Sequence, residues 1–142
     1  MNKGNIMIKI AIVGADENKW KGYDIHVVKE TIIDILKRPC TLISGHCPYG
    51  GVDIWAEDYA NSKGIETQIY KPQYNRWKPH GYEERNILIA QKCDIMYVIS
   101  PRNQNTVIWN GGIWTGNYAK RLGKTVSFIS ITQDNKVLVD SS

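Results

Sequence analysis

Hydrophobic residues along the chain alternate between short β-branched runs and stretches with helical spacing. Residues 7 to 13 (MIKIAIV) form an apolar run that stops at Gly14, which is typical of a strand buried on at least one face. From residue 25 to residue 36, apolar side chains recur three or four positions apart, as on one face of a helix. Asp24 is placed to cap that helix and Pro39 lies just beyond its end.

The same alternation continues to the end of the chain. Short strands are predicted at 41–44 and 66–70, on either side of a helix that starts near Val52 and ends at Gly64. The later elements are a helix at about 82–93, a strand at 94–100, a loop at 101–112, a short helix at about 113–122, a strand at 125–131 and a tail that either adds an edge strand or frays.

This order predicts the fold class. Strands that alternate with helices about five times are typical of an α/β protein, here a three-layer Rossmann-like sandwich with a mostly parallel sheet of five to six strands. We expect the first strand to be central and residues 1–142 to form a single domain. In such sheets, ligands bind beyond the carboxyl ends of the strands, so the segments that follow each strand are the ones to examine.

Three strand-to-helix turns carry candidate chemistry. Gly45, Gly50 and Gly51 let the backbone approach a ligand, and the N–H groups that open the following helix suit a phosphate or carboxylate. Asp53 lies in the first turn of that helix. The structural alternative is that the glycines only permit a tight turn, with Asp53 stabilising the helix through its dipole.

The other two turns precede later helices. Arg85 and Asn86 open the helix at 82–93, and an arginine suits bidentate contact with phosphate; alternatively, it is an exposed arginine paired with Glu83 or Glu84. Gly111 and Gly112, with the Thr115 hydroxyl nearby, form a second candidate anion-binding turn or simply a turn. Features at three neighbouring strand ends favour a ligand site over three separate turns.

Composition and charge limit the possible location of the protein and the class of ligand. The chain has no apolar run of 18 residues and no secretory signal before the first strand, so we expect a cytoplasmic protein without a membrane segment. Its net charge of +4 favours an anionic ligand without identifying one. Three cysteines without CxxC spacing argue against a disulfide framework, and His46, Cys47 and His80 fit no zinc pattern, so we expect no metal and no cofactor.

Three stretches together resemble a known superfamily: ISG…GGVDIWAEDYANSKGIE, GYEERNILIAQKCDIMYVIS and GGIWTGNYAKRLGKTV. Over residues 7–130 the chain resembles the SLOG superfamily of Rossmann-like nucleotide-binding proteins, which includes DNA-processing protein A, the LOG phosphoribohydrolases and, as the closest match, the small YspA-like branch. The resemblance implies a nucleotide-like small molecule as partner and, by analogy, a homo-oligomer. The residues expected to line the crevice are Gly14, Asp16, Gly45, Gly50, Gly51, Asp53, Arg85, Asn86, Ser100, Gly111, Gly112 and Thr115.

The chain departs from the LOG enzymes at one motif. Those enzymes carry Pro-Gly-Gly-x-Gly-Thr followed by paired glutamates, whereas residues 110–118 here read NGGIWTGNY and put Asn117 where a carboxylate is expected. Cleavage of an N-glycosidic bond develops positive charge on the ribose, which a carboxylate stabilises. A hydrolase would have to use other carboxylates, and of Asp16, Asp53, Glu83 and Glu84 the favoured catalytic pair is Asp53 with Glu84.

Three functions remain open at this point. The favoured one is a module that binds a nucleotide or nucleotide-derived phosphorylated ligand, as a sensor or carrier. The alternative is a nucleotide-processing hydrolase of the N-glycosidic type. The least favoured is single-stranded nucleic-acid binding through Tyr74, Arg76 and Trp77. Trp20, Trp77 and Trp109 fall in predicted loops, where an aromatic ring either stacks on a base or plugs the end of the sheet core.

Overall fold

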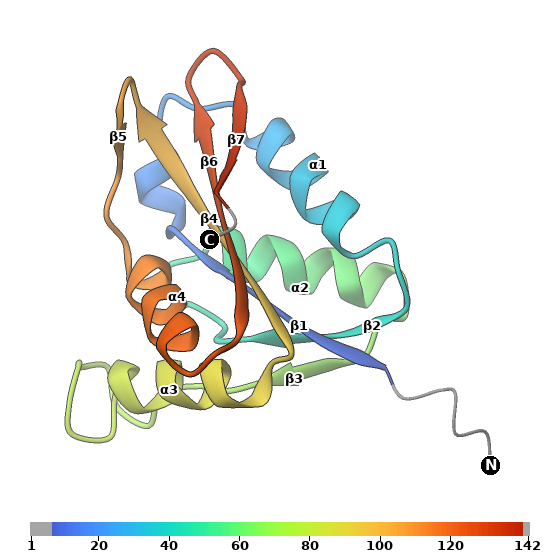
Figure 1. Ribbon diagram of the computed structural model, residues 1–142, viewed down its shortest axis with the longest axis vertical. Coiled ribbons are helices and arrows are strands. Elements are labelled where there is room, and N and C mark those ends of the chain that lie inside the picture. The colour runs from blue at the N-terminus through green and yellow to red at the C-terminus, as the bar shows by residue number, and fades with distance from the viewer. Residues whose placement is uncertain (1–6, 141–142) are drawn as a thin grey trace.

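The computed structural model describes residues 7–140 as one sheet with helices on both faces (Figure 1). Its strands lie in the order β3-β2-β1-β4-β6-β7, with β5 beside β4. β7 and β5 are antiparallel to their neighbours, and the other pairs are parallel. The elements are β1 (Ile8–Gly14), the 3-10 helix η2 (Glu17–Trp20), α1 (Ile25–Ile35), β2 (Cys40–Ser44), α2 (Val52–Ser62), β3 (Thr67–Ile69), α3 (Tyr82–Lys92), β4 (Ile95–Asn103), β5 (Thr106–Val107), α4 (Gly111–Arg121), β6 (Thr125–Thr132) and β7 (Val137–Asp140).

The strand side chains alternate between two cores. Ile10 and Ile12 of β1 pack with Val28 of α1 in one core, which also takes in α2. Ala11 and Val13, one position along, pack with Ile89 of α3 in the other core, which also takes in α4. Helices α1 and α2 therefore cover one face of the sheet and α3 and α4 the other, which makes the three layers of a Rossmann-like sandwich (Figure 1).

The predicted alternation and the central first strand are confirmed, since β1 pairs with both β2 and β4. The expected capping of α1 is also present: the Asp24 carboxylate accepts a hydrogen bond from the His26 N–H at 3.0 Å. The sheet has seven strands rather than five or six. The tail forms β7, and the segment expected to be a loop carries β4 on to Asn103 and turns back as β5.

This topology places a crevice above β1. From β1 the chain adds β2 and β3 on one side of β1, and it then adds β4 and β6 on the other side. The strand order therefore reverses between β1 and β4. Glycines let the elements approach closely there. A Cβ on Gly14 would collide with the Ile99 carbonyl oxygen, and a Cβ on Gly112 would lie 2.7 Å from the Gly14 backbone. The N-terminus of α4 consequently packs directly against the end of β1.

None of the helices in residues 7–140 combines the length and the apolar character needed to cross a membrane.

Candidate functional site

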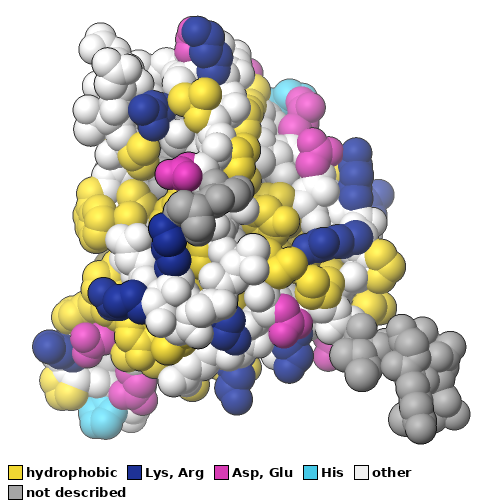
Figure 2. Space-filling view, in the orientation of Figure 1, with side chains coloured by type: hydrophobic (Ala, Val, Ile, Leu, Met, Phe, Trp, Pro, Cys, Tyr) yellow, Lys and Arg dark blue, Asp and Glu magenta, His cyan; other side chains and the backbone are white. Residues whose placement is uncertain are grey.

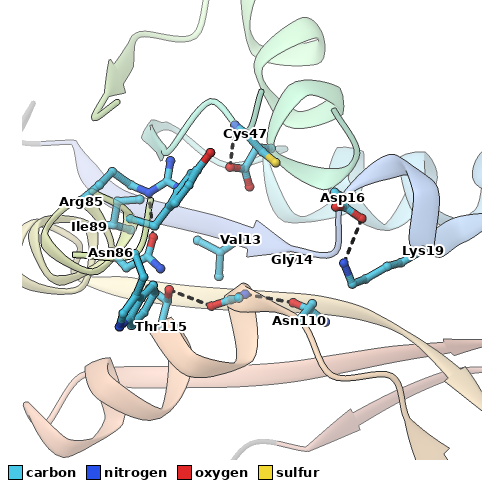
Figure 3. Close-up of a pocket in the computed structure, with 15 residues that line it drawn as sticks. Val13, Gly14, Asp16, Lys19, Cys47, Arg85, Asn86, Ile89, Asn110 and Thr115 are labelled. Atoms are coloured by element: carbon cyan, nitrogen blue, oxygen red, sulfur yellow. Dashed lines mark hydrogen bonds and ion pairs between the residues drawn. The ribbon is translucent and has the colours of Figure 1, made fainter. Parts of the chain in front are cut away.

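A cavity of about 220 Å³ opens where β1 ends, between the N-terminal turns of α2, α3 and α4 (Figure 3). Val13 and Gly14 lie at its centre, with Arg85 and Asn86 on one side and Asp16 and Lys19 on the other. Its lining is completed by Cys47, Asp53, Trp77, Tyr82, Ile89, Asn110, Gly111, Gly112 and Thr115.

Arg85 is the buried cation of this cavity, with 8% of its surface exposed. Its Nε donates to the Asn86 Oδ1 at 2.7 Å, its Nη1 donates to the Gly45 carbonyl, and its guanidinium lies 5.2 Å from the centre of the Tyr82 ring. All these partners are neutral, and no ion pair to Arg85 is formed within residues 7–140. The alternative expected from the sequence, pairing with Glu83 or Glu84, is therefore not observed.

Gly45 is needed for this arrangement. A Cβ at that position would lie 2.8 Å from the Arg85 Cζ, and closer still to Nη1, so only glycine lets the guanidinium reach the backbone carbonyl. The residue thus holds Arg85 in place, although it does not itself line the cavity.

Asp53 is the buried carboxyl of the cavity, with 7% of its surface exposed. It lies in the first turn of α2 and accepts a hydrogen bond from the Cys47 N–H at 3.1 Å. Burial raises the pKa of Asp53 to about 6, although the positive charge of Arg85 acts in the opposite direction. Asp53 can therefore gain or lose a proton near neutral pH, in contact with the cavity.

The N-terminus of α4 is organised by Asn110. The Asn110 Oδ1 accepts from the Gly112 N–H at 3.0 Å, and its Nδ2 donates to the Ser100 Oγ at 2.9 Å and to the Ile108 carbonyl at 3.0 Å. The Thr115 hydroxyl donates back to the Gly111 carbonyl at 3.0 Å. The first turn of α4, whose N–H groups carry the positive end of the helix dipole, is thereby fixed against the cavity.

The segment after β1 forms the remaining wall. The Lys19 Nζ lies 3.3 Å from the Asp16 Oδ1, and both residues line the cavity (Figure 3). The Ala15 carbonyl fixes this segment, because it accepts from the Trp20 Nε1–H and from the Val52 N–H, each at 3.2 Å.

Eight of the twelve residues expected to bind a ligand line the cavity: Gly14, Asp16, Asp53, Arg85, Asn86, Gly111, Gly112 and Thr115. The other four do not line it. Gly45 and Ser100 hold Arg85 and Asn110. Gly50 and Gly51, with φ of 77° and 86°, form the tight turn into α2, and a Cβ on Gly51 would collide with the Ala15 carbonyl.

The two carboxylates favoured for catalysis are not brought together. Glu84 precedes Arg85 on α3, and successive residues of a helix point about 100° apart. Its side chain is exposed, lies 3.2 Å from the His80 Nδ1 and does not line the cavity. Asn117, at the position of the missing LOG carboxylate, lines a different cavity between α4 and the β6–β7 edge.

Several lining residues were absent from the sequence-based set: Val13, Lys19, Cys47, Tyr82, Ile89 and Asn110. Asn110 could have been predicted from the sequence, because an asparagine directly before two glycines and a helix is a typical N-cap. Lys19 and Cys47 could not have been, since only tertiary structure brings them to the crevice.

A second polar cluster lies behind the turn at residues 45–51. The buried Glu57 accepts from the Ser44 hydroxyl at 2.6 Å, and its other oxygen lies 2.7 Å from the His46 Nδ1. These contacts tie the end of β2 to α2. Within residues 7–140, no group of three or more His, Cys, Asp or Glu side chains is arranged to hold a metal ion.

No protein-family model and no curated protein sequence matches this chain. A solved structure with a similar fold is that of the molybdenum cofactor carrier protein MCP from Chlamydomonas reinhardtii. The two superpose with a TM-score of 0.61 over 86% of this chain and 76% of that one, at 15% sequence identity. At this identity, the common property of the two proteins is the Rossmann-like α/β fold.

Proposed function

We propose that this protein binds a nucleotide or nucleotide-derived phosphorylated ligand in the crevice above β1, as a cytoplasmic sensor or carrier of the SLOG type. The observation that carries the proposal is the state of Arg85: a guanidinium that is nine-tenths buried, lines a cavity and forms no ion pair within residues 7–140. Burying a charge is costly unless a counter-charge is close. The Asp53 carboxylate is close enough to interact with Arg85 but forms no ion pair with it, and a bound phosphate would supply a direct counter-charge.

Two further features support an anion. The first turn of α4 contributes Gly111 and Gly112 to the cavity, and the N-terminus of a helix attracts negative charge. Lys19, which is paired with Asp16, lies across the cavity from Arg85 and is a second cation at this site (Figure 3). The fold also occurs in MCP, a cofactor carrier protein, which supports binding of a small ligand in general terms.

Nucleic acid is a weaker fit to the surface. On the face drawn in Figure 2, Lys and Arg side chains are scattered among acidic and neutral ones and form no continuous basic stripe. A single enclosed guanidinium favours a small phosphorylated molecule.

Two measurements test the proposal. Native mass spectrometry of the purified protein should reveal a co-purifying phosphorylated small molecule. Titration with a panel of nucleotides should show that Arg85→Ala weakens binding at least about tenfold, which is the scale of a lost charge-assisted hydrogen bond of roughly 1.5 to 3 kcal/mol.

Arg38→Ala is the matched control for that titration. It removes the same charge from an exposed arginine just before β2, at the amino-terminal ends of the parallel strands, whereas the crevice lies at their carboxyl ends. Equal affinities for Arg85→Ala and the parent protein would remove Arg85 from the site.

Asp53 supports a second candidate, the hydrolase. A carboxyl with a pKa of about 6 that lines the cavity suits general acid or base catalysis. Such an enzyme would depend on Asp53 rather than on Glu84, since Glu84 lies outside the cavity.

A further inference from the structure

The crevice has aromatic side chains on one side only. Trp77, from the loop between β3 and α3, and Tyr82, from the first turn of α3, line it on that side. The charged residues Asp16 and Lys19 line the opposite side, after β1 (Figure 3). The buried Arg85 lies on the same side as Tyr82, with its guanidinium 5.2 Å from the centre of that ring, so a ligand that fits this side has a flat apolar part joined closely to a negatively charged part.

Trp77 is held in a defined orientation. Its ring packs edge-to-face on Trp114 of α4, with ring centres 4.8 Å apart and planes at 87°. Trp114 in turn stacks on Tyr118, with centres 5.5 Å apart and planes at 9°. Hydrophobic side chains are visible over this α4 region in Figure 2.

The backbone that carries Trp77 is fixed as well. The Trp77 carbonyl accepts from the Glu83 N–H at 3.0 Å, and the neighbouring Arg76 carbonyl accepts from the Tyr82 N–H at 2.8 Å. The Tyr74 N–H donates to the His80 carbonyl at 3.0 Å, which closes the loop on itself. Ordering the indole therefore costs little further entropy when a ligand binds.

Plugging the end of the sheet core does not explain Trp77. That role belongs to Trp20, which is 1% exposed and part of the α1–α2 core. Trp77 belongs to neither core cluster and remains 39% exposed while it lines the cavity. A large ring held by its neighbours but left uncovered beside a cavity is a stacking surface for a flat ligand.

We propose that Trp77 selects the ligand class: a heteroaromatic ring joined to a phosphorylated sugar, with the ring packed on the Trp77 indole and the phosphate against Arg85. This inference rests on the proposed function and adds to it the recognition of the base. Stacking tolerates different bases because each has a π-face, so Trp77 distinguishes ligands with a ring from those without one more strongly than one base from another.

The test compares nucleoside monophosphates (AMP, GMP, CMP and UMP) with ribose 5-phosphate, which lacks the base. By isothermal titration calorimetry, the parent protein should bind the nucleotides more tightly than ribose 5-phosphate. Trp77→Ala should lower nucleotide affinity about five- to 150-fold and leave ribose 5-phosphate within about twofold. Trp77→Phe, which keeps an aromatic ring, should retain most of the nucleotide affinity.

Controls separate the outcomes. Trp109→Ala removes an indole that is 61% exposed and does not line the cavity, so it should change neither affinity. Equal binding of nucleotides and ribose 5-phosphate by the parent, or an equal loss for both in Trp77→Ala, would overturn the role of Trp77 while the Arg85 proposal stands. Absence of binding to every probe would overturn both.

Discussion

Replacing Asp53 by asparagine should make the protein less sensitive to rising pH. Asp53 is buried at the crevice, and this burial raises its pKa from 3.8 to about 6. Between these two values, the native protein binds a proton at Asp53 that the unfolded chain has released. Asp53 therefore lowers the free energy of unfolding progressively as the pH rises from about 4 through 6, and the loss is complete above that value.

The size of the effect follows from the two pKa values. Each unit of difference between the two pKa values changes the free energy of unfolding by about 1.4 kcal/mol, so the rise from 3.8 to about 6 corresponds to about 3 kcal/mol. Asparagine does not titrate, and its side-chain oxygen can still accept the Cys47 N–H hydrogen bond. Relative to the parent, Asp53→Asn should gain about 3 kcal/mol in unfolding free energy between pH 4 and pH 8.

Urea denaturation of both proteins at pH 4, 5, 6, 7 and 8 measures this difference. Any constant cost of burying the amide cancels, because only the change with pH is compared. Asp58→Asn is the matched control, because it makes the same substitution at an exposed position of the same helix that does not line the cavity. A difference for Asp53→Asn that stays flat between pH 4 and 8 would refute the reasoning.

Two other predictions concern the glycines of α4 and the chemistry of the crevice. Gly111→Ala should leave the stability unchanged or slightly higher, since the added Cβ would meet no neighbouring side chain or tertiary contact within 4 Å. Gly112→Ala should lower the melting temperature, because its Cβ would lie 2.7 Å from the Gly14 backbone. Thermal denaturation followed by circular dichroism compares them, and equal melting temperatures would contradict the packing described. Incubation with nucleoside monophosphates should release no free base above background by chromatography. The carboxylates that line the cavity in the described chain are Asp16 and Asp53, and because Asp16 is paired with Lys19, Asp53 has no second free carboxylate beside it to share the acid and base roles. Rapid base release that Asp53→Asn abolishes would favour the hydrolase instead.

The sequence was most informative where structure depends on local spacing. The apolar run before Gly14 and the helical spacing after Asp24 predicted β1 and α1, because both patterns are set by which face of an element is buried. β5 was missed because it consists of Thr106 and Val107 alone, paired with Arg102 and Asn103. Two residues show no periodicity, and their pairing depends on the course of β4.

The cavity shows the same difference between features that depend on local sequence and features that depend on the tertiary fold. The sequence singled out Arg85 as a phosphate-binding residue because it lies near the start of the helix at 82–93, on the crevice side of the predicted sheet. Only the folded structure shows that its hydrogen bonds go to neutral oxygen atoms. Glu84 was selected on the same reasoning, but its position next to Arg85 in the sequence did not predict that its side chain lies outside the cavity, beside His80. Lys19 and Cys47 come from different turns that meet only in the folded chain.

The three helices that begin at the crevice are not equivalent as anion sites. In α2, the Val52 N–H already donates to the Ala15 carbonyl, and in α3, the Tyr82 and Glu83 N–H groups donate to the carbonyls of the preceding loop. These three N–H groups are satisfied by backbone carbonyls. The first turn of α4 is capped instead by the Asn110 side chain and contributes two glycines to the cavity wall.

An anion in the crevice therefore has two main attractive groups, the start of α4 and the Arg85 guanidinium. Asp53 lies close enough to Arg85 for the guanidinium to oppose the rise in its pKa, so a bound anion near Arg85 would further disfavour the Asp53 carboxylate. Anion binding and proton uptake by Asp53 would be coupled for that reason. A buried guanidinium that forms no ion pair within residues 7–140 and a buried carboxyl with a raised pKa both reduce stability, and both lie at this one cavity. Sites that retain such groups at a cost to stability are characteristically functional, and both groups would respond to the charge of a bound anion.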